Sequence, residues 1–268
     1  MIKETQSQNL PTYMKIPITT LASFLLGLLP AAAGTYVPAP GVTMPAESAS
    51  DWSFRMALYG WAQSLDGDVA ARGISAPVDV GFDDIVENLD FGAMGAIEIG
   101  YGRWSFLADG VYAEISASAS TPFGFVADSL DAELKQFLGH FVIAYEVLRT
   151  DGAKLDVYGG VRVNWIDLEI ELGPLGSSDD EGWTDPIIGA RFQAELGDSF
   201  FFRALGDVGG FGVASDFTWQ AMAGFGYRFN EHCSALLTYR AIGTDYSDGG
   251  FTYDVTSHGP LIGLEFRF

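Results

Sequence analysis

The sequence is poor in cysteine, in histidine and in long apolar runs. Cys233 is the only cysteine among 268 residues, which excludes an internal disulfide. Three histidines leave few candidates for a catalytic base or a metal ligand. No segment reaches about 20 consecutive apolar residues, the length at which a helix spans a bilayer. Any insertion of this chain into a membrane must therefore use strands.

Basic residues are scarce as well. Lys and Arg together number 14 against 35 Asp and Glu, which gives a formal net charge of −21. A chain this acidic is not expected to bind nucleic acid, because nucleic-acid affinity comes largely from neutralising phosphates. The charge suits divalent cations or cationic ligands, and it equally suits a solvated acidic surface. Both interpretations stay open at this point.

The amino-terminal segment has the pattern of a secretory signal. Met14 and Lys15 begin a short basic region, an apolar run follows over 18–29, and Ala31-Ala32-Ala33 gives the small residues of a signal-peptidase site. We expect a signal peptide at residues 1–33, with translation starting at Met14.

Residues 34–50 are rich in Pro, Ala and Ser and are expected to form an extended periplasmic lead-in. The folded domain is expected at residues 51–268.

Within that domain, apolar and polar residues alternate with a period of two. At the carboxyl end Phe266 and Phe268 fall on an apolar face, and Glu265 and Arg267 fall on a charged face. Such alternation is typical of a strand between two different environments. In 217–229 the apolar face has aromatics at both ends and alanines between them, which matches aromatic girdles at two membrane interfaces. The pattern predicts an all-β fold, an antiparallel up-and-down transmembrane β-barrel.

Two kinds of connection separate the predicted strands. Short turns are expected at 101–103, 150–153, 196–199 and 229–232. Longer acidic or glycine-rich connections are expected near 65–90, 119–130, 173–183, 209–216 and 246–251. Short and long connections alternate, as in barrels with short periplasmic turns and longer outer loops. Four turns and five loops predict ten strands, with eight as the alternative because 65–90 is hard to divide.

Carrying the alternation through every strand predicts which charged residues face the lumen. The basic set is Arg55, Arg162, Arg191, Arg203, Arg228, Arg240 and Arg267, and the acidic set is Glu98, Asp109, Glu146, Asp156, Glu195, Asp207 and Glu265. Equal numbers favour an ion-paired, largely plugged lumen, because buried charges are tolerated when they are paired. A charged permeation path would predict an excess of one sign.

Acidic residues also gather in the predicted loops. The candidates for weak Ca²⁺ or Mg²⁺ binding are Asp79, Asp83, Asp84, Glu87, Asp179, Asp180 and Glu181. None of these runs has the spacing of an EF-hand, so a solvated acidic surface is the simpler alternative. The apolar residues of 82–89 have helical spacing, which predicts a short amphipathic helix lying over the barrel mouth with its apolar side down.

Catalytic motifs are missing from the sequence. It contains no G-x-S-x-G elbow, no H-E-x-x-H and no pair of cysteines. His140 is predicted to face the lumen, and His258 lies near Asp245 and Asp254 at the outer end of the last strand. We expect a protein that is not an enzyme, with an outer-rim hydrolase as a remote alternative.

Residues 51–268 resemble the outer-membrane β-barrel superfamily, in particular its OmpA-like and OmpW-like small barrels. The segments 65–69, 82–91 and 251–268 also resemble a group of bacterial envelope proteins without an assigned function. This resemblance implies a Gram-negative outer membrane, contacts with its lipid and lipopolysaccharide, and assembly by the barrel-assembly machinery with Phe266 and Phe268 as the signal. It implies a structural or interaction protein of the envelope, or alternatively a narrow porin-like channel for small solutes.

Overall fold

The computed structural model describes residues 52–71, 74–120, 129–172 and 175–268. The predicted signal peptide and lead-in lie outside these residues. The described chain comprises β1 (Trp52–Trp61), β2 (Ser64–Ala71), β3 (Ile74–Val80), α2 (Phe82–Glu87), β4 (Leu89–Tyr101), β5 (Trp104–Ser120), β6 (Ser129–Arg149), β7 (Ala153–Leu172), β8 (Leu175–Glu195), β9 (Phe200–Gly210), β10 (Phe217–Arg228), β11 (Cys233–Asp248) and β12 (Phe251–Arg267). No helix among them is long and apolar enough to cross a membrane.

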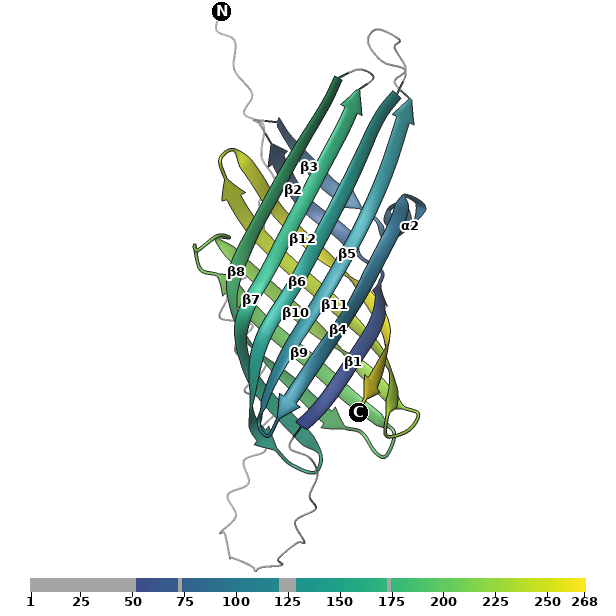
Figure 1. Ribbon diagram of the computed structural model, residues 1–268, viewed down its shortest axis with the longest axis vertical. Coiled ribbons are helices and arrows are strands. Elements are labelled where there is room, and N and C mark those ends of the chain that lie inside the picture. Colours follow the sequence, from purple (N-terminus) through teal and green to yellow (C-terminus); the bar gives the residue numbers. More distant parts are fainter. Residues whose placement is uncertain (1–51, 72–73, 121–128, 173–174) are drawn as a thin grey trace, which may run out of the picture. The chain divides into compact units, whose positions relative to one another are not determined.

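Ten strands form a closed antiparallel ring (Figure 1). Strands β4 to β12 follow one another in order, and β1 closes the ring because it pairs with both β4 and β12. Where β1 meets the end of the chain, which we call the seal, the Phe268 amide donates to the Phe54 carbonyl at 2.9 Å. The Phe54 amide donates to the Phe268 carbonyl at 3.3 Å. The prediction of a ten-stranded all-β barrel is confirmed, and the eight-stranded alternative is wrong.

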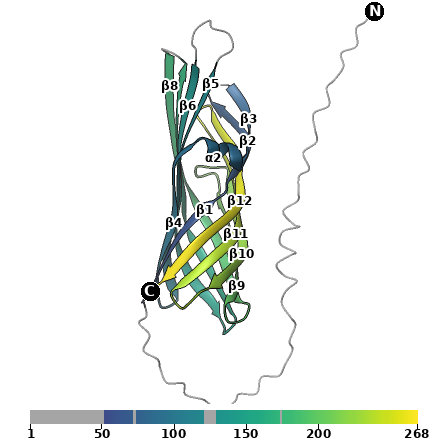
Figure 2. The same cartoon turned by 90° about the vertical axis from the view of Figure 1, so that its right-hand side faces the viewer.

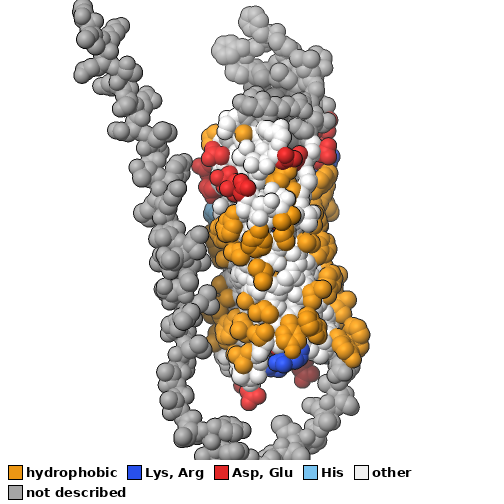
Figure 3. All heavy atoms as spheres, turned by 90° about the vertical axis from the view of Figure 1, so that its left-hand side faces the viewer, with side chains coloured by type: hydrophobic (Ala, Val, Ile, Leu, Met, Phe, Trp, Pro, Cys, Tyr) orange, Lys and Arg blue, Asp and Glu red, His pale blue; other side chains and the backbone are white. Residues whose placement is uncertain are grey.

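The alternation of side chains between the two faces of the wall also follows the prediction. In β10, Phe217 and Phe225 are 46% and 58% exposed on the outside, while Thr218 and Gln220 are buried inside. Figure 3 shows the apolar side chains spread over the outer wall, with acidic side chains gathered above them. An exposed apolar wall around a charged interior is stable only where the wall meets lipid. The closed strand ring therefore spans an outer membrane.

At the outer ends of the strands, two predicted loops are wrong. The connection expected at 173–183 is largely strand, because β7 and β8 pair as far as Leu172 and Leu175. The loop expected near 246–251 is a two-residue turn, Gly249-Gly250, with φ angles of 54° and 95°. Two successive positive φ angles are typical of a hairpin turn whose twist matches that of the strands. In both places the sequence lacks the apolar alternation that marks a strand, although the pairing continues.

The long connection expected at 65–90 folds into β2, β3 and α2. β2 continues along β12 where β1 ends, since Trp61 pairs with Leu261 and Ser64 pairs with His258. Within the described residues, β3 pairs only with β2, and residues 89–94 of β4 pair only with β5. The edges of β3 and of residues 89–94 therefore face a gap in the strand pairing, which we call the seam.

The short helix α2 links the two edges of the seam (Figure 2). It confirms the predicted helix, but its predicted burial is wrong. Phe82 and Val86 are 40% and 49% exposed, and no residue of α2 is buried. Ile85 is half-buried while Phe82 and Val86 are exposed, so α2 does not pack its apolar side down onto the barrel mouth.

Candidate functional site

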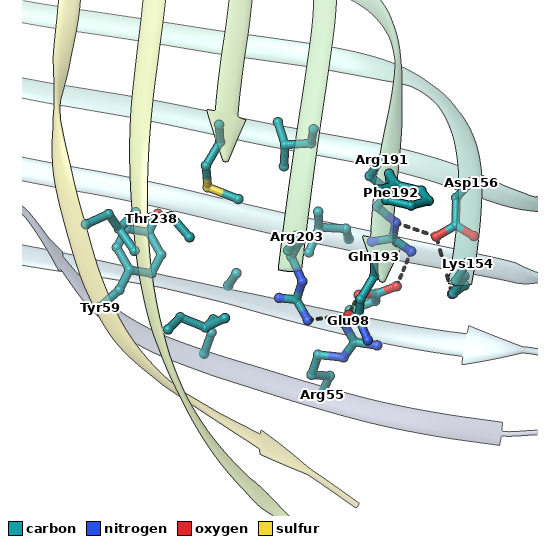
Figure 4. A pocket seen from close by; sticks show the side chains of 17 residues that line it. Arg55, Tyr59, Glu98, Lys154, Asp156, Arg191, Phe192, Gln193, Arg203 and Thr238 are labelled. Atoms are coloured by element: carbon teal, nitrogen blue, oxygen red, sulfur yellow. Dashed lines mark hydrogen bonds and ion pairs between the residues drawn. The ribbon is translucent and has the colours of Figure 1, made fainter. Parts of the chain in front are cut away.

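The lumen near the short turns holds a layer of paired charges (Figure 4). Arg191 of β8 donates to Asp156 of β7 at 2.6 Å and to Glu98 of β4 at 2.5 Å. Arg55 of β1 approaches the same Glu98 at 3.5 Å, and Lys154 approaches Asp156 at 3.3 Å. Four strands thus contribute to one network that crosses the lumen.

Glu265 of β12 joins this layer as an acid shared by several arginines. Arg203 of β9 donates to it at 2.8 Å and Arg267 donates at 2.9 Å, while Arg55 lies 3.8 Å away. The Glu265 side chain is only 1% exposed. A carboxylate this deeply buried depends on these cations, because removing them would leave its charge uncompensated.

Beneath this layer, an aromatic ring faces the guanidinium groups. Phe201 of β9 is fully buried, and the guanidinium carbons of Arg203, Arg228 and Arg267 lie 5.4, 4.7 and 5.9 Å from its ring centroid. Cations at this distance from a ring are attracted by its quadrupole. Arg228 also forms a bidentate pair with Glu195, at 2.5 and 2.7 Å. Phe201 was not among the predicted site residues.

A second layer lies farther along the lumen and is centred on Arg162 of β7, which is 0% exposed. Arg162 donates to Asp207 at 2.5 Å, to Thr218 at 2.5 Å and to His140 at 2.8 Å. Asp207 also accepts a hydrogen bond from the Tyr158 hydroxyl at 2.9 Å. Each nitrogen of the guanidinium thus has a protein acceptor, and each carboxylate oxygen of Asp207 has a protein donor.

Arg240 of β11 extends the second layer across the lumen. It donates to Asp109 of β5 and to Gln220 of β10, both at 2.9 Å, and Asp109 accepts from Tyr59 at 2.6 Å. His140 accepts from Arg162 at Nε2, and its Nδ1 lies 3.3 Å from Asp109. These contacts assign a neutral ring protonated at Nδ1. His140 is thus a hydrogen-bonded structural residue.

Every predicted lumen residue is found in an ion pair, but not every partner was predicted. Glu146 pairs with Arg149 and Lys154 near a short turn, not with a lumen arginine. Another buried acid escaped prediction: Asp185 of β8 accepts from the amide and hydroxyl of Ser215 at 2.8 and 2.6 Å. These bonds fix the loop between β9 and β10. Asp185 has the same parity in β8 as the inward Arg191, which would have placed it in the lumen.

The predicted cation-binding residues lie on three separate elements. Asp79 lies in β3, Asp83, Asp84 and Glu87 lie in α2, and Asp179, Asp180 and Glu181 lie in β8. Glu181 accepts a hydrogen bond from the Tyr246 hydroxyl at 2.7 Å, whereas Asp180 is exposed. Among the side chains that the structure describes, no group of three or more His, Cys, Asp or Glu residues is arranged to hold a metal ion.

His258 takes part in a small polar cluster on the outer wall. Its Nε2 lies 2.7 Å from Asp66 of β2, and its Nδ1 lies 2.7 Å from the Tyr239 hydroxyl of β11. Both ring nitrogens are therefore engaged, one by a carboxylate and the other by a hydroxyl. The cluster ties β2 to β12 and β11.

Solved structures of known barrels share this architecture to a limited degree. The outer membrane protease OmpT from Escherichia coli has a TM-score of 0.47 and 12% sequence identity, covering 81% of this chain and 97% of that one. The transport unit of the autotransporter AIDA-I from Escherichia coli has a TM-score of 0.41 and 8% identity, covering 85% and 93%. Neisserial surface protein A has a TM-score of 0.31 and 15% identity, covering 82% and 98%.

No protein-family model matches the sequence, and no curated protein matches it either. The assignment of the class follows from the strand register, the exposed apolar wall and the charged lumen. Together these define an outer-membrane β-barrel protein of the Gram-negative envelope.

Proposed function

We propose that the protein is a structural or interaction protein of the cell envelope whose lumen is closed to solutes by its own paired charges. The observation that carries this proposal is the second layer, where Arg162 and Asp207 are bonded to each other and are almost inaccessible to water. A charged permeation path would have hydrated charges, with one sign in excess. Here Arg162 and Arg240 are buried, and each guanidinium has a carboxylate partner.

The space left between the layers supports the same proposal. The cavity beside His140, Asp207 and Arg240 has a volume of only about 60 Å³. That volume accommodates a few water molecules, since one water needs roughly 10–15 Å³ by the same measure. It is too small for a continuous hydrated column through this level of the barrel.

The interaction side of the protein would be its outer face. Acidic side chains lie there just above the apolar wall, including Asp216, Asp245 and Asp254. This is the level at which lipopolysaccharide carries phosphates bridged by divalent cations, so we include lipopolysaccharide among the proposed partners.

Single-channel recording in planar bilayers tests the closed lumen against the alternative of a narrow channel. The wild type is expected to conduct weakly or intermittently. The double variant Arg162→Ser/Asp207→Ser removes a positive and a negative charge together, so it opens the cross-section without leaving an unpaired ion. It is expected to give a steady conductance.

Arg149→Ser is the matched control, because Arg149 lies at a short turn with its side chain 62% exposed. It is expected to record like the wild type. A large, steady, cation-selective conductance in the wild type would overturn the proposal and favour the channel.

A further inference from the structure

A larger cavity of a different character lies in the outer half of the barrel. Its volume is about 240 Å³. Six aliphatic side chains line it: Leu65, Val69, Val78, Leu134, Ile166 and Val255. They come from β2, β3, β6, β7 and β12, so the cavity crosses the lumen from one wall to the other. Its lining is mostly apolar, whereas the two layers nearer the short turns are charged.

Two polar side chains, Gln136 and Glu181, also line this cavity. Glu181 accepts the Tyr246 hydroxyl at 2.7 Å. The Trp183 ring stacks on Tyr246 with centroids 4.2 Å apart and contacts Tyr253, which itself lines the cavity, at 5.5 Å. The aromatic group fixes one wall, so the cavity is preformed.

An apolar floor separates the cavity from the charges below. Trp61, Val111, Leu138, Ile242 and Leu261 form one buried cluster inside the barrel. On the same strands the cavity residues lie farther out, with Leu134 four residues beyond Leu138 and Val255 six residues beyond Leu261. The cavity therefore faces the outer side, and its properties do not depend on whether the lumen conducts.

The seam gives the outer half a wall that is not hydrogen-bonded all the way round. Val78 lines the cavity from β3, the strand that forms one edge of the seam. On α2, which bridges the seam, Phe82 and Val86 are exposed apolar side chains. An apolar molecule approaching from the side meets apolar surface there, not a closed ladder of strands.

We propose that this cavity is a binding site for an uncharged apolar molecule. Apolar cavities of about 150 Å³ stay dry and bind benzene. A volume of about 240 Å³ suits a two-ring aromatic or a stretch of acyl chain of roughly ten heavy atoms by the same scale. The ligand is either a free apolar compound or the acyl chain of an outer-leaflet lipid, and the experiment below separates these two sources.

The test is a naphthalene titration of the barrel in nanodiscs of chain-deuterated phosphatidylcholine, followed through methyl resonances. Methyl groups of Leu134 and Ile166 are expected to shift and saturate. Lipid-facing methyl groups of Ile188 and Leu264 report naphthalene dissolved in the bilayer and are expected to shift linearly. Linear shifts at every site would overturn the proposal, as would water cross-peaks at Leu134.

Substitutions connect the saturable response to the cavity. Val78→Phe fills part of the space and is expected to weaken naphthalene binding by about tenfold or more, in line with the cost of overpacking. Leu134→Phe tests the opposite wall should Val78→Phe fail to fold, which heat-modifiable gel migration reports. Val208→Phe makes the same change on the lipid-facing wall and should leave binding unaltered. Equal weakening by Val208→Phe would overturn the assignment to the cavity.

A second arm identifies the source of the ligand. In nanodiscs of protonated lipid without naphthalene, cross-peaks between acyl methylene protons and Leu134 methyl groups, lost on adding naphthalene, would identify a lipid chain as the occupant. Their absence, together with saturable naphthalene binding, would identify a free apolar compound.

Discussion

The half of the barrel near the short turns and the outer half are built from the same strands but from opposite chemistry. In the first, inward positions carry charge, as at Asp207, and the wall closes where β1 meets both of its neighbours. In the second, inward positions such as Val255 are apolar, and the wall is interrupted at the seam. Along β6–β7 and β11–β12 the pairing continues from one half to the other, while the lumen changes from a packed polar core to an apolar cavity. The two halves should therefore differ in the substitutions that they tolerate.

The largest effect is expected from breaking the seal of the closed half. Deleting Phe266–Phe268 removes the pairing of Phe266 with Met56 and the reciprocal bonds between Phe268 and Phe54. An open barrel would expose unpaired strand edges to lipid, where no water can satisfy them. We expect the truncated chain to stay unassembled in the periplasm, as measured by loss of heat-modifiable migration. Normal migration would show that closure does not depend on these residues.

The next effect comes from removing one partner of a buried pair. Arg162→Met leaves Asp207 uncompensated inside the barrel and should lower the free energy of unfolding by about 3–5 kcal/mol. Arg149→Met is the control, because Arg149 is 62% exposed and Lys154 remains 3.7 Å from the buried Glu146; its cost should be clearly smaller. Urea unfolding in detergent micelles measures both. Similar losses would mean that the second layer is hydrated in solution.

A matched pair of truncations compares the two halves directly. Leu261→Ala cuts into the packed cluster beside Trp61 and should cost about 2–5 kcal/mol. Leu65→Ala enlarges a cavity that already exists, so fewer contacts are lost and the cost should be clearly smaller. The same urea titrations give both values. Equal costs would show that the outer half is packed as tightly as the inner one.

The smallest effect concerns charge on the outer wall beyond the lipid. Asp254 lies directly opposite Asp245 on one side and Asp68 on the other. Partial burial and then the charges of Asp254 and Asp216 raise the pKa of Asp245 above its ordinary value. The folded state thus holds this proton more tightly than the unfolded state, so stability falls as the pH rises through the pKa of Asp245.

Asp245→Asn should therefore stabilise the barrel at neutral pH by about 0.2–1 kcal/mol, the range for like charges on paired strands. The gain should disappear near pH 3, below the ordinary Asp pKa of about 3.9. Asp248→Asn is the control, because Asp248 pairs with Phe251 and not with an acid. Melting curves at the two pH values test the difference, and a gain that persists at the lower pH would contradict it.

The sequence predicted the membrane-spanning part well because lipid and lumen impose opposite demands on alternate residues. Arg191 and Ile188 could be placed on opposite faces from that rule alone. The rule weakens at the outer ends of β7 and β8, where residues 173–183 show no apolar alternation and their sequence predicts a loop. It also fails at Phe201, since Phe200 and Phe202 on either side are equally apolar. The partners of Arg162 depend on register between strands far apart in sequence, which composition does not contain.

The β2–β3 hairpin was the hardest element to predict, for a related reason. Asp66 and Asp68 made its first strand resemble an acidic loop, although Leu65 and Val69 already alternate with them. Which face of the wall Leu65 and Val69 occupy is set by the pairing of β2 with β12, which the sequence of β2 alone does not reveal. The cavity that they line therefore needed the three-dimensional pairing to be recognised.

Cys233 gives the molecule a built-in reporter of its own orientation. It is the only sulfhydryl of the chain and begins β11 beside a short turn, where it is partly exposed. If the short turns face the periplasm, a membrane-impermeant maleimide should leave this thiol unmodified in intact cells and label it once the outer membrane is opened. Labelling in intact cells would mean that the barrel is inserted the other way up, and the cavity would then open toward the periplasm.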